Sequence, residues 1–363
     1  MQLNSPERNS KGELIAEALS GAWRSDPPPL EISSDELERI APLLLKSGAA
    51  ALAWRRIRHT DLRASPTANE FYQVYRFQTL QARIDQRKIE QVFKLLRSVQ
   101  VEPILVKGWA IARLYPKQGL RPYGDIDVCV REEQSATAEA ALKTPEGRQY
   151  LVDLHRGFAK LGGGGTDALY ARSQLVRLGE TDVRVLGPED HLRVLCFHLL
   201  REGAWRPLWL CDIAVALESR HANFDWEHCF AGTKRSRELI FCAIGLAHRL
   251  LSADVDDIPF AESVKQLPRW AVPTVLSEWA SPQPSMTRRH LAPMITYWHH
   301  PSGVLKGLRN RWPNPVEATI VAGGPFNDLP RLPLQIRSYL AHATSFLVRR
   351  LKLCLQGIGK RRA

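Results

Sequence analysis

The 363-residue sequence lacks long apolar runs and closely spaced cysteines. No stretch approaches the roughly 18 consecutive apolar residues of a membrane-spanning helix, so we expect no span. The first residues contain no apolar segment of the kind that a secretory signal requires. The six cysteines are scattered without a C-x-x-C pair, which indicates reduced thiols and argues against a disulfide framework. These absences predict a cytoplasmic protein.

The sequence is rich in positive charge, but only at one end. The formal net charge is +12, and residues 284–363 hold 13 Lys and Arg against only Glu317 and Asp328. The other residues hold 37 bases and 36 acids and are nearly neutral. The basic segment is compatible with a solvated face, a nucleic-acid patch, a surface for an acidic partner or an amphipathic helix on a membrane surface.

Residue patterns divide the chain into five parts. Apolar residues at helical spacing recur before residue 97 and after residue 187, whereas short branched runs between them indicate strands. We expect a flexible N-terminus (1–34), a helical segment (35–97), an α/β core (98–186), a helical domain (187–280) and a basic Pro/Trp-containing segment with a terminal helix near 334–355 (281–363). This order predicts an α+β fold, with a small mixed sheet embedded between helical segments.

The middle part carries the clearest strand patterns. The run 101–106 is a short buried strand, and Lys107-Gly108 turns the chain into a helical patch. A Gly/Pro-rich loop then leads into Asp125-Ile126-Asp127-Val128-Cys129-Val130, which alternates strictly. Further strands are expected at 150–155 and 183–186.

Alternation gathers acidic side chains on one face of these strands. Asp125 and Asp127 share a face, and Asp153 shares one with His155. Hard divalent cations such as Mg²⁺ prefer carboxylate oxygens together with substrate phosphates. These residues also have interpretations without a catalytic or metal-binding role. The aspartates then lie on a solvent-exposed edge strand, and His155 is a half-buried side chain held by hydrogen bonds.

Several of these motifs together resemble a known family. The segments 104–110, 114–116, Arg121, 124–128, 152–156, 186–192, His198, 209–212 and 311–315 are similar to those of uncharacterised bacterial nucleotidyltransferases of the polymerase-beta superfamily. The resemblance covers most of the chain from about residue 70, and its most specific part is the Asp125-x-Asp127 block. It implies a polymerase-beta-like core.

The resemblance also implies roles for individual residues. Asp125 and Asp127 would hold two Mg²⁺ ions that bind the triphosphate, and Asp153 would complete the metal site near the acceptor hydroxyl. Lys107 and Arg121 would neutralise phosphate charge, and Gly108 would keep the turn small. Independently of the resemblance, the face that His155 shares with Asp153 predicts that it orients a carboxylate or contacts the substrate. One departure is Trp109, which stands where the superfamily usually has Gly or Ser.

These roles predict an enzyme that transfers a nucleoside monophosphate from an NTP, most simply ATP, to a hydroxyl acceptor and releases pyrophosphate. The acceptor is open between a small molecule, a peptide, a protein and RNA. The alternative is a non-catalytic nucleotide-, nucleic-acid- or partner-binding protein that uses the basic segment. A third interpretation is an RNA-directed transferase, in which that segment holds the acceptor.

Three polar residues on the later helices fit core roles better than a metal site. His191 and His198 lack the close ligand spacing typical of zinc, so we expect them to pack in the core. Asp212 lies on an apolar helix, where a buried carboxylate requires a partner. We expect that partner to be Arg206 or His198.

Overall fold

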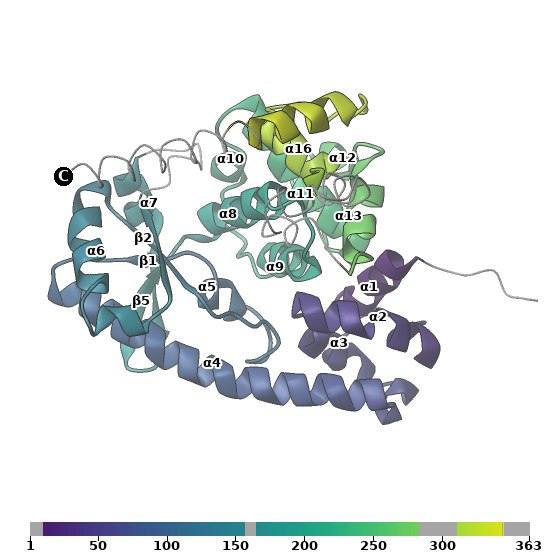
Figure 1. Ribbon diagram of the computed structural model, residues 1–363, viewed down its shortest axis with the longest axis horizontal. Coiled ribbons are helices and arrows are strands. Elements are labelled where there is room, and N and C mark those ends of the chain that lie inside the picture. Colours follow the sequence, from purple (N-terminus) through teal and green to yellow (C-terminus); the bar gives the residue numbers. More distant parts are fainter. Residues whose placement is uncertain (1–9, 157–164, 283–310, 343, 345–363) are drawn as a thin grey trace, which may run out of the picture.

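The computed structural model describes residues 10–156, 165–282, 311–342 and 344, and it combines many helices with one sheet (Figure 1). The helices that precede the last strand are α1 (Lys11–Leu19), α2 (Ser34–Ser47), α3 (Ala50–Ile57), α4 (Pro66–Ser98), α5 (Trp109–Ala112), α6 (Ser135–Leu142) and α7 (Thr166–Arg172). Those that follow it are α8 (Pro188–Arg201), α9 (Pro207–Glu218), α10 (Trp226–Cys229), α11 (Lys234–Leu251), α12 (Ala261–Lys265), α13 (Ala271–Trp279) and α16 (Pro315–Val321).

The five strands form one mixed sheet, which confirms the expected α+β fold. They are β1 (Ile104–Leu105), β2 (Ile126–Val130), β3 (Val152–Arg156), β4 (Gln174–Leu178) and β5 (Thr181–Val185). Their spatial order is β3-β2-β1-β5-β4; β2 is parallel to β3 and antiparallel to β1, which is parallel to β5. The antiparallel neighbour β4 was not predicted, because it lies at the sheet edge and exposes Leu175 where an alternating pattern would bury an apolar residue.

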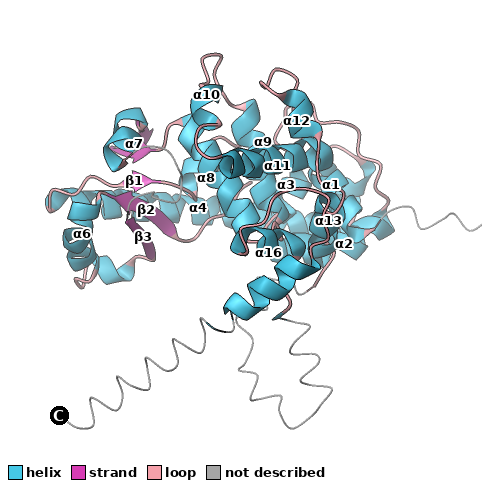
Figure 2. Ribbon diagram, turned by 90° about the horizontal axis from the view of Figure 1, so that it is seen from above, coloured by secondary structure: helices cyan, strands magenta, loops and turns pink. Residues whose placement is uncertain are grey.

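Both faces of the sheet are covered by helices. Ile126, Val128 and Val130 of β2 point into a core shared with α4 and α6. Cys129 points the other way, into a smaller core with residues of α7 and α8. In Figure 2 the strands lie at one end of the molecule, among these helices. The predicted alternation of β2 is therefore observed, and it leaves Asp127 on the same face as Cys129.

A second and larger core joins helices from both ends of the sequence. It contains buried side chains of α1, α2, α3, α8, α9, α11 and α13. The N-terminal and later helical segments therefore pack on each other, although the sheet separates them along the chain. Helix α4 runs along both parts (Figure 1), with Phe71 in the larger core and Phe93 in the core of the sheet.

The expectation of a flexible segment 1–34 is wrong for its described part. Helix α1 begins after Ser10, whose side chain accepts a hydrogen bond from the Glu13 backbone while Glu13 caps Ser10 in return. This reciprocal cap satisfies backbone donors at the helix start. Leu14 and Leu19 are buried in the larger core, so apolar burial fixes the helix. Residues 1–9 lie outside the described part.

Only a portion of the basic C-terminal segment is described. Helix α16 begins after Asn314, whose side chain accepts a hydrogen bond from the Glu317 backbone, and residues 332–342 are also helical. The expected helix over 334–355 therefore has its first part in place, whereas 283–310 and 345–363 lie outside the described residues. Within the described ranges, no helix is long and apolar enough to cross a membrane.

Candidate functional site

Three of the expected site residues meet on strands β2 and β3. The parallel register pairs Asp127 with Asp153, which places the two carboxylates side by side. One ligand atom from each of Asp127, Asp153 and His155 lies within 4.8 Å of the other two. The His155 Nε2 atom is 3.0 Å from Oδ1 of Asp127 and 3.4 Å from Oδ2 of Asp153. Asp127 is buried and Asp153 is exposed, so the cluster opens to solvent through Asp153.

Lys107 reaches the same cluster from the turn after β1. Its Nζ atom lies 2.5 Å from Oδ1 of Asp127. The turn depends on Gly108, which has a φ of 58°, a value that favours glycine. A Cβ at Gly108 would also lie 3.4 Å from the backbone oxygen of Asp125. The expected Lys107-Gly108 turn therefore brings an ammonium group to the carboxylates.

The surroundings of Asp127 keep it ionised. Burial alone would raise its pKa, but the hydrogen bond to His155 and the charge of Lys107 outweigh that effect and lower the pKa below its usual value. Two carboxylates with an adjacent imidazole form a donor set suited to a divalent cation. The Asp127 and Asp153 oxygens fit Mg²⁺, whereas nitrogen ligands such as His155 are more typical of transition metals.

Asp125 does not belong to this cluster. Strand β2 begins at Ile126, so Asp125 lies one residue before it, where it is exposed. Burial lowers the pKa of Arg206, and the charge of Asp125 acts against that shift. The same charge adds to the effect of Asp212, which raises the pKa of Arg121. The metal-binding role of Asp125 therefore stays a prediction.

Arg121 is committed to a buried ion pair, which corrects the expectation that it is free to bind phosphate. Its Nη2 atom is 2.7 Å from Oδ2 of Asp212, and its Nε donates to Oδ1 at 3.1 Å. The Tyr115 hydroxyl donates to the same carboxylate at 2.8 Å. Asp212 is fully buried, so it requires these donors. Its expected partners, Arg206 and His198, were the wrong ones.

The end of α8 and the start of α9 form a wall of packed aromatic side chains. The ring of His198 packs edge-on against Trp209, with centroids 4.5 Å apart. Burial, followed by the charges of Lys107 and Arg201, lowers the pKa of His198 to about 3. His198 is therefore neutral, and the charges of Lys107 and Asp127 act on its pKa in opposite directions. This wall was not expected from the sequence.

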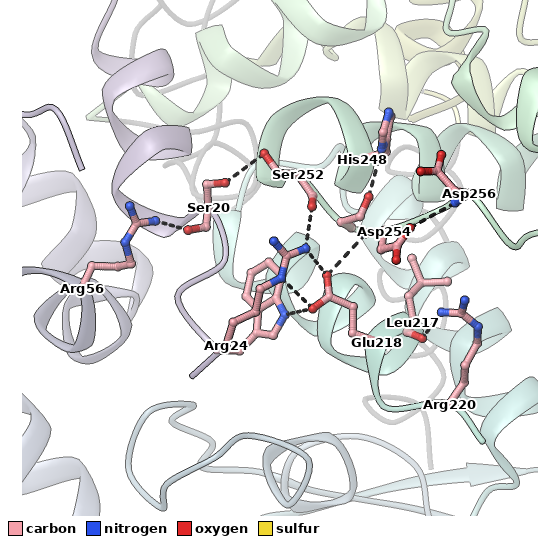
Figure 3. A network of polar contacts seen from close by, with 12 residues as sticks. Ser20, Arg24, Arg56, Leu217, Glu218, Arg220, His248, Ser252, Asp254 and Asp256 are labelled. Carbon is pink, nitrogen blue, oxygen red and sulfur yellow. Dashed lines mark hydrogen bonds and ion pairs between the residues drawn. The ribbon is translucent and has the colours of Figure 1, made fainter. Parts of the chain in front are cut away.

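A separate cavity of about 1020 Å³ lies at the C-terminal end of α9. Figure 3 shows the polar contacts of four residues that line it, Arg24, Glu218, His248 and Asp254. Its lining includes Arg24, Glu218, Trp226, His248 and Asp254. The 12 residues of α9 span ~18 Å at the usual helical rise. The cavity is thus about that far from the start of α9, and its lining includes none of Lys107, Asp127, Asp153 and His155.

One comparison with known proteins matches the part of the chain that contains this cluster. A family model described as an uncharacterised nucleotidyltransferase matches residues 33–147 and 144–252. The matched ranges cover more than half of the chain and contain the whole sheet, the carboxylate cluster and the wall formed by α8 and α9. No curated protein and no solved structure matches the chain.

Proposed function

The chain belongs to this family of uncharacterised nucleotidyltransferases, and on that premise we propose that it transfers a nucleoside monophosphate from an NTP to a hydroxyl acceptor. ATP is the simplest donor, Mg²⁺ the metal, and pyrophosphate the second product. The observation that carries the proposal is the grouping of Asp127, Asp153 and His155 beside Lys107. Adjacent carboxylates with a neighbouring cation are what phosphoryl-group transfer requires of a protein.

The residues that would hold the metal are Asp127 and Asp153, with Asp125 joining them from the entry of β2. Bound divalent ions supply charge neutralisation along the phosphates and orient the reacting oxygens. His155 contacts both carboxylates through one nitrogen, so it fixes their relative position. Lys107 shares the Asp127 carboxylate, and its ammonium group is available to the phosphates when a metal takes that oxygen.

Asp153 is the group proposed to take the proton. It is exposed, whereas Asp127 is buried and engaged by Lys107 and His155. In the proposed step the acceptor oxygen bonds to the α-phosphorus, and the bond from that phosphorus to the bridging oxygen of the β-phosphate breaks. The hydroxyl proton goes to Asp153, and pyrophosphate leaves.

The test uses the full chain with Mg²⁺, each NTP labelled at the α-phosphate, and a cell extract that supplies acceptors. We expect label transfer to lose at least about a hundredfold in Asp127→Asn, since a charge at the reacting phosphates is removed. Asp182→Asn, an exposed aspartate on β5 of the same sheet, is the matched control and keeps wild-type transfer. Equal transfer by Asp127→Asn and wild type, or no transfer by wild type with any NTP, would disprove the proposal.

A further inference from the structure

Arg206 is the residue immediately before α9, at the N-terminal end of that helix. It is half-buried, and its Nε donates to the backbone oxygen of Ser47 at 2.7 Å. A Cβ at Gly48 would lie only 2.7 Å from Nη2 of Arg206 and 3.3 Å from Cγ of Pro122. The guanidinium group therefore passes over Gly48, and the same glycine faces Pro122, three residues before Asp125. This contact fixes its place between α2 and the entry to β2.

The charge of Arg206 has no counter-ion in direct contact among the described residues. The nearby carboxylate of Asp212 is occupied by Arg121 and Tyr115. Burial, and then the charge of Arg121, lowers the pKa of Arg206 to about 10, although Asp212 and Asp125 act in the opposite direction. A cation held in this way is costly for the fold unless an anion joins it.

The neighbour of Arg206 in sequence also has an unused donor. The indole Nε1 of Trp205 is buried and has no hydrogen-bond partner in the described part of the chain. Trp205 packs edge-on against Trp209, with centroids 5.4 Å apart, and the guanidinium of Arg206 lies 5.8 Å from the Trp209 ring centroid. These aromatic contacts hold the Arg206 side chain beside the ring of Trp209.

We propose that Arg206 binds the polyphosphate chain of the nucleotide, in the role that the sequence suggested for Arg121. The inference rests on the proposed function, because it places a triphosphate beside Asp125 and Asp127. An arginine fork matches phosphate oxygens in geometry as well as in charge. Arg121 lacks this capacity, since Asp212 and the backbone oxygen of Pro122 already take its donors.

The experiment measures binding of inorganic tripolyphosphate to the full chain by titration calorimetry, at low salt and with EDTA present. We expect Arg206→Gln to weaken binding on the order of tenfold or more, as for loss of a charge-assisted hydrogen bond. Arg249→Gln removes an exposed arginine at the other end of the helical part and should change the affinity less than about twofold. Unchanged binding by Arg206→Gln, or no binding by the wild type, overturns the inference.

A second variant covers the case in which Arg206→Gln does not fold. Arg206→Lys keeps the charge but loses the fork, so we expect a severalfold weaker affinity for tripolyphosphate with an unchanged melting temperature. Wild-type affinity in Arg206→Lys would contradict a role for the fork. Asp127→Asn separates the anion site at Arg206 from the proposed nucleotidyl transfer. It should lose label transfer but keep its affinity for tripolyphosphate, because binding through Arg206 needs no metal. Loss of binding in Arg206→Gln without any label transfer by the wild type would support the anion site and reject the enzyme.

Discussion

The two ends of helix α9 each carry a half-buried charge, but only the charge at the C-terminal end has a counter-ion among the described residues. At the end of the helix, Glu218 accepts hydrogen bonds from Trp23 Nε1 at 2.7 Å and from Arg24 Nε at 2.9 Å (Figure 3). Burial would raise the pKa of Glu218, yet Arg24 and Trp23 lower it. At the start of the helix, Arg206 donates to one backbone oxygen and has no ion pair in the described structure.

This difference indicates that the charge at the Glu218 end stabilises the fold, whereas the charge at the Arg206 end is available to bind an anion. A carboxylate that already accepts hydrogen bonds from several protein donors stabilises the fold and has little hydrogen-bonding capacity left for a ligand. A half-buried cation without a counter-ion costs stability and leaves an anion to be supplied from outside. We therefore expect substitutions at the Glu218 end to change unfolding only. Substitution of Arg206 should change anion affinity and leave the free energy of unfolding within about 1 kcal/mol of wild type.

The largest expected effect on stability is at Asp212, within α9. Asp212→Ala leaves Arg121 buried without its counter-ion, so we expect a loss of about 3–5 kcal/mol in the free energy of unfolding. Urea denaturation followed by circular dichroism measures it. The double variant Arg121→Met/Asp212→Leu removes both charges and should recover most of the loss. A loss of less than about 1 kcal/mol in Asp212→Ala would show that the core around α9 tolerates a buried arginine without a counter-ion. The argument that the unpaired charge of Arg206 requires an anion would then fail.

A smaller effect is expected at Glu218. Glu218→Gln keeps the shape of the side chain but removes the charge that Arg24 faces at 2.5 Å. We expect a loss of about 2 kcal/mol from the free energy of unfolding, because this pair is only partly exposed. Tripolyphosphate affinity should stay at the wild-type value. A drop in that affinity would show that the two ends of α9 are coupled, against our interpretation.

Taken per pH unit, the smallest expected effect is a dependence of stability on pH through His191. Burial lowers its pKa from the usual 6.5 to about 4, and the charge of Arg113 adds to this. Between these two pH values the unfolded chain binds a proton that the folded chain excludes. The free energy of unfolding therefore falls with falling pH, by up to about 1.4 kcal/mol per pH unit for this one group.

Urea denaturation at several pH values between about 4 and 7 measures that slope. His191→Gln should reduce it by the contribution of one proton, whereas His221→Gln, on an exposed loop, should leave it unchanged. An unchanged slope in His191→Gln would show that the interior around Asp212 admits a further positive charge.

Much of the fold could be predicted because its patterns are local. The alternation in 125–130 predicted β2, and helical spacing predicted α8, α9 and α11. Helix α1 was missed, although Ser10 and Glu13 form a capping box that can be recognised in the sequence. Strand β4 had no such signal, because an exposed edge strand does not bury alternate residues.

The site was predictable only as far as its residues lie on neighbouring strands. Asp127, Asp153 and His155 meet because β2 and β3 pair in parallel, and their shared alternation indicated this. The pairing of Arg121 with Asp212 joins residues 91 positions apart, and no local pattern indicates it. The proposed role of Arg206 had no comparable signal, because Trp205 precedes it but Pro207 follows it in the sequence.

The long helix α4 has a consequence for how the molecule unfolds. Its 33 residues form a rod of about 50 Å, with Phe71 in the larger core and Phe93 in the core of the sheet. Neither core can lose its packing without exposing one end of the same continuous helix. The two cores should therefore melt as one cooperative unit, and the geometry between sheet and helices is preserved until the whole chain unfolds.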